Sequence, residues 1–230
     1  MTQLATEFHP PGDLAHHFND LEQQKEAATL GMWLFLATEV MLFGALFLGY
    51  TVYRRMHYEA FVHASNHLYI SLGTINTVVL LTSSLMMALG VHAARRGDST
   101  WIVRYLLITI ALGLLFIGIK LTEYYLDYRE RLIPWGDWWR PHSADSRIDR
   151  EMQLFFVFYF IMTMLHAIHM VIGMSILGVI AWLAHKKRFS EKYYTPVDMI
   201  GLYWHFVDIV WVFLFPVLYL INPAARAAGH

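Results

Sequence analysis

The sequence predicts an all-α fold: a polytopic membrane bundle with five transmembrane helices. Hydrophobic residues make up 57% of the 230 residues and charged residues only 15%, whereas soluble domains carry about 25% charged residues. Five apolar stretches exceed the ~20 residues that a helix needs to cross a bilayer. They cover residues 29–53, 69–93, 101–125, 152–184 and 200–222. We therefore expect one membrane domain at 29–222, between a polar tail at 1–28 and a short tail at 223–230.

Composition and motifs exclude several function classes. A formal charge of −1 lacks the basic footprint of a nucleic-acid-binding protein. The absence of cysteine removes disulfides, thiolate metal sites and thiol nucleophiles. No Gly-rich phosphate loop, nucleophile elbow or His-Glu-x-x-His motif occurs in the sequence. We expect no catalytic residue and no nucleic-acid partner.

The first stretch carries a carboxylate, Glu39, about ten residues inside its apolar run. At ~1.5 Å of rise per residue, Glu39 lies ~15 Å deep, near the centre of a ~30 Å hydrocarbon core. A charge at that depth costs several kcal/mol, so a buried partner, a bound proton or a function must account for it.

The second and third stretches carry polar residues expected to be structural. Asn76, followed by Thr77, is expected to hydrogen-bond across helices. Lys120 and Glu123 are spaced i,i+3 and are expected to form an ion pair near the end of their helix.

The fourth stretch is longer than one crossing requires, which predicts tilt or an extension beyond the bilayer. It carries His166 and His169, whose i,i+3 spacing allows two imidazoles to meet one metal. A haem site needs histidines on several helices, and no carboxylate lies close in sequence for a di-metal site. Packed, hydrogen-bonded histidines are therefore favoured over metal ligands, and we expect no metal site.

The fifth stretch places His205 and Asp208 three residues apart on one helical face. Asp208 is expected to hold a ring N–H of His205, or the two side chains to share a proton. Pro216 is expected to kink this helix. Glu39, His205 and Asp208 together leave open an independent proton or ion carrier.

The Lys and Arg residues outside the apolar stretches indicate how the chain is oriented across the membrane. The side of the N-terminal tail has seven Lys and Arg residues, six of them in two short loops, and the opposite side has eight. The high density of Lys and Arg in the two short loops favours a cytoplasmic N-terminus and a periplasmic C-terminus. The longest connection, residues 126–151, contains the run Pro134-Trp135-Gly136-Asp137-Trp138-Trp139-Arg140. This run is typical of an interfacial anchor, with a partner-docking surface as the alternative.

Five motifs, in this order, resemble subunit III of haem–copper cytochrome c oxidase, and the resemblance runs from about residue 28 to 222. They are residues 31–43 (GMWLFLATEVMLF), 75–77 (INT), 123–125 (EYY), 166–173 (HAIHMVIG) and 203–211 (YWHFVDIVW). The last motif is highly specific, whereas the Asn-Thr motif is weak. The five spans look like the bacterial form that lacks the two extra N-terminal helices of the seven-helix version.

The resemblance implies a non-catalytic subunit of a proton-pumping respiratory oxidase in the bacterial cytoplasmic (inner) membrane. It implies no haem or copper in this chain; these cofactors belong to partner subunits. Subunit I would be the main neighbour, alongside other oxidase subunits and possible supercomplex partners. Phospholipid would lie in a cleft, and the subunit would support proton uptake and sustained turnover. Glu39 matches the family's carbodiimide-reactive carboxylate, and His205 matches a histidine near lipid and subunit I.

Two positions depart from the family pattern. The family usually has Gly-x-His-Gly-x-His in the fourth span, whereas this chain has Met164 and Ala167 at the two glycine positions, which puts a close helix approach there in question. Lys120 stands where an uncharged residue, often glutamine, is common. The alternatives within the superfamily are subunit III of a quinol oxidase and the homologous accessory subunit of nitric oxide reductase.

Overall fold

The computed structural model describes residues 20–135, 138–191 and 193–221. All regular elements in this part are α-helices, and five are long and apolar enough to cross a membrane. The fold class predicted from the sequence is confirmed. The helices are α1 (Leu21–Met56), α2 (Tyr58–Ser65), α3 (Ile70–Arg95), α4 (Ser99–Arg129), α5 (Ser146–His185) and α6 (Thr195–Tyr219).

Two helices extend beyond their apolar stretches. α1 begins at Leu21 because the Asp20 side chain accepts a hydrogen bond from Gln23 N at 2.7 Å, so the last eight residues of the expected polar tail are helical. α5 has 40 residues, or ~60 Å at 1.5 Å per residue, about twice the hydrocarbon thickness. This length agrees with the expected extension beyond the bilayer. Residues 1–19 and 223–230, the remainder of the two predicted tails, lie outside the described residues.

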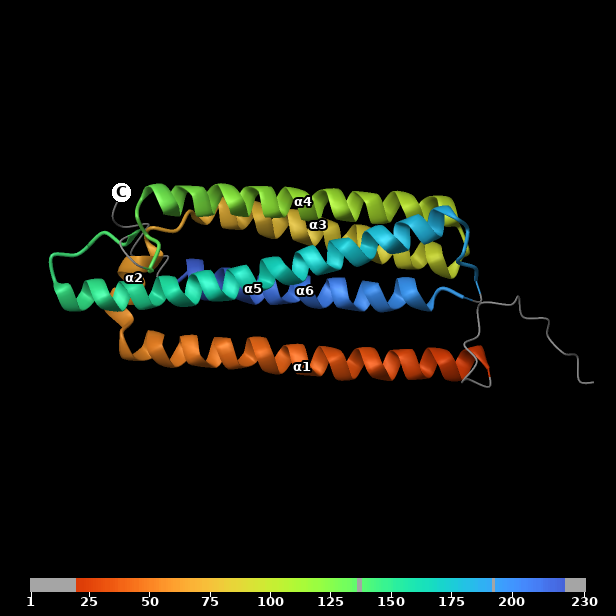
Figure 1. The fold of residues 1–230 in the computed structure, drawn as a ribbon, viewed down its shortest axis with the longest axis horizontal. Helices are drawn as coiled ribbons and strands as arrows, with labels where there is room; N and C mark the ends of the chain where they lie inside the picture. The colour runs from red at the N-terminus through yellow and green to blue at the C-terminus, as the bar shows by residue number, and fades with distance from the viewer. Residues whose placement is uncertain (1–19, 136–137, 192, 222–230) are drawn as a thin grey trace, which may run out of the picture.

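The five long helices run side by side along one axis (Figure 1). We call the end at which α1 begins the inner end, and the end at which α6 stops the outer end. The short helix α2 and the connection from α4 to α5 lie at the outer end (Figure 1). The chain crosses the bundle five times, so the ends of the described part lie at opposite ends of the bundle.

α1 is peripheral and α6 is central. Only 11% of the apolar window of α1 is buried within the chain, against 50% for α6. α1 lies along one edge and contacts α5 and α6 (Figure 1). A helix this exposed in a membrane protein faces lipid or another subunit over most of its surface.

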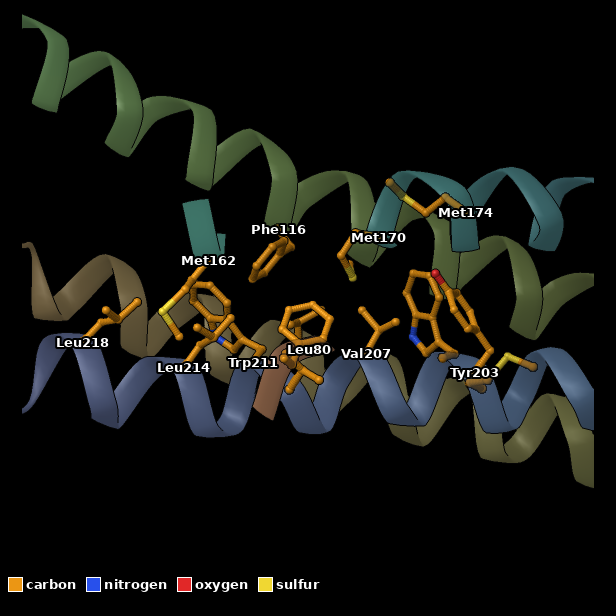
Figure 2. Packing of buried hydrophobic residues seen from close by; sticks show 14 of the residues in the cluster. Leu80, Phe116, Met162, Met170, Met174, Tyr203, Val207, Trp211, Leu214 and Leu218 are labelled. Carbon is orange, nitrogen blue, oxygen red and sulfur yellow. The ribbon is translucent and has the colours of Figure 1, made fainter. Parts of the chain in front are cut away.

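Aromatic and methionine side chains fill the space between α4, α5 and α6 (Figure 2). Phe116 and Trp211 meet edge to face, with ring centroids 4.8 Å apart. Further toward the inner end, Trp204 packs against two glycines. A Cβ at Gly113 or at Gly173 would lie 3.1 Å from a Trp204 ring atom. α5 therefore approaches α6 closely at Gly173.

The outer connection is tied to the start of α5. Trp139 Nε1 donates to Asp149 Oδ2 at 2.8 Å, and the backbone N–H of His142 donates to Asp149 Oδ1 at 2.7 Å. The side chains of Trp135 and Trp138 are about half exposed. These two exposed rings suit the predicted role at the water–lipid interface, which stays a prediction.

Candidate functional site

Glu39 forms an acid–base pair with His169 of another helix. Its Oε2 atom lies 3.0 Å from His169 Nε2, and the other ring nitrogen, Nδ1, lies 2.8 Å from the Leu165 carbonyl oxygen. The two side chains are 14% and 10% exposed. The deep carboxylate thus has its partner within the same chain. Sequence spacing did not reveal this partner, because 130 positions separate the two residues.

The hydrogen bonds of His169 fix the number of protons that the pair carries. A carbonyl oxygen only accepts, so His169 Nδ1 must hold a proton for its bond to Leu165. The bond between Nε2 and Oε2 also needs one proton, which belongs either to the imidazole or to the Glu39 carboxyl. In both arrangements the pair is neutral overall. Neutrality is what the centre of a hydrocarbon core favours.

An apolar slot opens beside the pair. It has a volume of about 480 Å³ and lies between α1, α5 and α6. Its wall is hydrophobic apart from Glu39, His169 and Tyr203. The Tyr203 hydroxyl donates to the His169 carbonyl at 3.0 Å and so joins α6 to α5 at this point. The slot can hold an apolar chain with the neutral acid–base pair at its side.

The structure does not bring His205 and Asp208 together, so the prediction of a hydrogen-bonded pair is wrong. His205 Nδ1 lies 2.7 Å from Ser84 Oγ of α3. Asp208 turns inward and is 3% exposed. Neither of its carboxyl oxygens has a hydrogen-bond partner among the described residues. The two side chains share a helical face and both lie near Ser84 of α3, but no hydrogen bond joins them.

His205 instead lines a second cavity, of about 350 Å³, between α3 and α6 at the inner end. His92, Arg95 and Asp198 also line it, and Arg95 pairs with Asp198 at 3.0 Å. This cavity and the slot beside Glu39 have no lining residue in common. Neither cavity is lined by all three of Glu39, His205 and Asp208, as a path of the independent-carrier hypothesis would require.

The remaining candidate residues in the spans, namely Asn76, Lys120, Glu123 and His166, are buried within the bundle. His166 packs against Phe116 and Trp211, and neither of its ring nitrogens has a hydrogen-bond partner among the described residues. Asn76 is fully buried with its amide likewise unpartnered there. The predicted cross-helix bond of Asn76 is thus wrong; its neighbour Thr77 accepts one from Trp211 Nε1 at 3.2 Å. Of the two histidines, only His169 is hydrogen-bonded as predicted.

The predicted ion pair of Lys120 and Glu123 is confirmed, with Nζ 3.0 Å from Oε2. Sequence reasoning missed the rest of its cluster. Lys120 Nζ also donates to the hydroxyls of Tyr159 at 3.0 Å and Tyr219 at 2.7 Å. Tyr219 donates to Glu123 Oε1 at 2.6 Å, and Tyr159 donates to Asp127 Oδ2 at 3.1 Å. Asp127 was detectable, because it is four residues beyond Glu123 on the same helical face.

In the described part of the chain, no group of three or more His, Asp or Glu side chains is arranged to hold a metal ion. The side chains of His166 and His169 point to different neighbours. His166 faces aromatic rings of α4 and α6, and His169 faces Glu39 on α1.

The fold and these sites define a class: a polytopic membrane protein of five spans, with buried acid–base groups and an apolar slot between its helices. The family model for cytochrome c oxidase subunit III matches residues 15–128 and 150–222. The chain belongs to this family. It is subunit III of a haem–copper oxidase, of either the cytochrome c or the quinol type, and associates with the other subunits of that oxidoreductase complex.

Relatives of both types are similar over almost their whole length. Cytochrome c oxidase subunit 3 of Thermostichus vulcanus is 31% identical over 212 residues, covering 91% of this chain and 92% of the relative. The protein of the same name from Corynebacterium diphtheriae is 28% identical, covering 84% and 88%. Quinol oxidase subunit 3 of Bacillus subtilis is 28% identical, covering 90% and 97%. The near-equal identities leave the electron donor open.

Proposed function

We propose that this chain is a lipid-holding subunit that flanks subunit I of a proton-pumping oxidase, where it supports proton uptake and sustained turnover. The observation that carries the proposal is the slot between α1, α5 and α6. An apolar chain fits its hydrophobic wall, and the Glu39–His169 pair adds no net charge to that environment.

The weak burial of α1 supports the same role. With only 11% of its apolar window buried, α1 forms one wall of the slot while most of its surface faces outward. A lipid in the slot would fill the gap between this peripheral helix and the central helices α5 and α6. Loss of that lipid would loosen α1 first, since α1 is the least buried of the five long helices.

Haem and copper would reside in the partner subunits, which carry out electron transfer. The proposal places this subunit in the bacterial cytoplasmic membrane, with the inner end of the bundle in the cytoplasm. Of the two donors, we propose cytochrome c, because the long outer connection with its exposed Trp135 and Trp138 offers a surface on the periplasmic side. A quinol oxidase is the second candidate, on the similarity to the Bacillus subtilis relative.

Removal of the whole subunit tests the role. We expect an oxidase lacking this chain to start at a normal rate but to inactivate sooner during turnover, because its redox centres lie elsewhere. The measurement is the half-life of oxygen consumption by the purified complex with and without the chain, with added phospholipid as a control. Equal half-lives would contradict the proposal.

Spectra of the native complex test the donor. Reduced-minus-oxidised difference spectra that show haem a, together with oxidation of added cytochrome c, would support the first candidate. Haem o or b with quinol oxidation would favour the second. Purification of the chain without any haem-containing partner would refute both.

A further inference from the structure

The cluster around Lys120 at the outer half of the bundle holds more acid than base. Lys120 is 2% exposed, and Glu123 and Asp127 are completely buried. Two carboxyl groups and one ammonium therefore share an interior from which solvent is excluded. With every group in its ordinary charge state the cluster would carry a net charge of −1. A buried net charge within a membrane span is costly, so the cluster is expected to be neutral.

The hydrogen bonds account for every proton on Lys120. Its Nζ has three oxygen neighbours, on Glu123, Tyr159 and Tyr219, at 2.7–3.0 Å. An ammonium has three N–H donors and no acceptor, so the three neighbours use all of its protons. Lys120 is thus held as a full cation, and each tyrosine oxygen accepts one of its hydrogen bonds.

Each tyrosine hydroxyl then has one proton left to donate. Tyr219 gives its proton to Glu123 Oε1, and Tyr159 gives its proton to Asp127 Oδ2. Both oxygens of Glu123 accept, one from Tyr219 and one from Lys120. A carboxyl group whose two oxygens both accept is the ionised form, so Glu123 is the counter-ion of Lys120.

Asp127 differs from Glu123 in the hydrogen bonding of one carboxyl oxygen. Its Oδ1 atom is buried and has no hydrogen-bond partner among the described residues. A bare anionic oxygen in a dry interior is far more costly than a neutral hydroxyl in the same place, and such a group takes up a proton instead. We propose that Asp127 is a proton-binding site that is loaded in the folded protein, with the proton on Oδ1. The cluster is then neutral.

The groups that face Asp127 agree with this assignment. On its own helix these are the Lys120–Glu123 ion pair and, at the exposed helix end, Glu130. Tyr159 faces it from α5, and Tyr219 belongs to the same cluster from α6. Glu130 Oε1 is engaged by the Tyr69 hydroxyl at 2.7 Å, a hydrogen bond that raises the pKa of Tyr69. Lys120 is the one cation of the cluster, and Glu123 already balances its charge.

Infrared spectroscopy of the assembled oxidase tests the proposal. A protonated carboxyl group has a C=O band that neither a carboxylate nor an amide shows. We expect the Asp127→Asn variant to lose one such band relative to the unaltered complex. The matched surface control Glu130→Gln should keep it. An unchanged band in Asp127→Asn would overturn the proposal.

Retention of the subunit gives a second readout. An asparagine reproduces the shape and neutrality of the protonated acid, so Asp127→Asn should be retained by the complex within about twofold of the unaltered chain. If Asp127 were instead a second counter-ion of Lys120, its loss would break a buried pair and lower retention about a hundredfold or more. A variant that fails to assemble would count as that second result and against the proposal.

Discussion

Two of the acid–base pairs in the bundle lie in contrasting settings. The Glu39–His169 pair joins the peripheral helix α1 to α5, is 14% and 10% exposed, and borders an apolar slot of about 480 Å³. The Lys120–Glu123 pair lies between three packed helices and is 2% and 0% exposed. Tyrosine hydroxyls complete its coordination, and the ring of Trp211 lies 5.5 Å from the ammonium.

The contrast indicates different roles for similar chemistry. A pair beside an open slot is reachable by a lipid or a reagent, and either of its two proton arrangements is neutral. A pair enclosed by hydrogen bonds from α4, α5 and α6 has no room for a ligand and holds those helices in register. The first setting is suited to function next to a neighbouring subunit, and the second to stability.

The largest effect is expected from Lys120→Met. This change leaves the buried Glu123 carboxylate without its counter-ion, which typically costs about 3–5 kcal/mol. We expect subunit III to be lost from the purified oxidase, as quantified by its stoichiometry after detergent washing. The control is Arg104→Met, which removes an exposed cation from the same helix and should have no effect.

The double variant Lys120→Met/Glu123→Gln sharpens this prediction. Removal of both charges leaves no uncompensated ion, so most of the lost retention should return. A double variant as poorly retained as Lys120→Met alone would show that the ion pair is not what holds α4 against α5 and α6.

A smaller effect is expected from Gly173→Ala on α5. The added Cβ would lie 3.0 Å from the Tyr203 ring and 3.1 Å from the Trp204 ring. Overpacking of this kind costs about 1–3 kcal/mol, which thermal unfolding of the complex would detect. Gly178→Ala on the same helix meets nothing within 4 Å and serves as the matched control. Equal melting temperatures for the two variants would contradict the packing described here.

The smallest effect on activity is expected from Glu39→Gln. Glutamine keeps the size and neutrality of the site, so the chain should fold and electron transfer should stay within about twofold. Carbodiimide labelling of subunit III should disappear, because the reactive carboxyl group is gone. Glu151→Gln, at the outer end, should leave the labelling intact. Loss of most of the initial turnover in an intact Glu39→Gln complex would contradict a non-catalytic role.

The fold was largely predictable from the sequence because bilayer thickness sets the length of an apolar helix. The five spans and the Lys120–Glu123 pair follow from composition and from i,i+3 spacing on one helix. The start of α1 at Leu21 was missed because those residues are polar, although Asp20 is a recognisable capping residue. The short helix α2, between Met56 and the third helix, carries no comparable apolar signal.

The partners of the candidate residues were less predictable, because they lie on distant helices. Nothing in the local sequence joins Glu39 to His169 or Lys120 to Tyr159 and Tyr219. The expected pairing of His205 with Asp208 was wrong for the same reason: sequence spacing places two residues on one face, but packing against α3 gives His205 a different partner in Ser84.

The most direct test of the proposed function fills the slot beside Glu39. Ile176 lines the slot, whereas Val179, three residues further along α5, does not. We predict that Ile176→Trp lowers the phospholipid content of the purified oxidase and shortens its half-life during turnover, with an unchanged initial rate. Val179→Trp should match the unaltered complex in both measurements. Equal lipid content and equal half-lives for the two variants would contradict a lipid-holding role for this site.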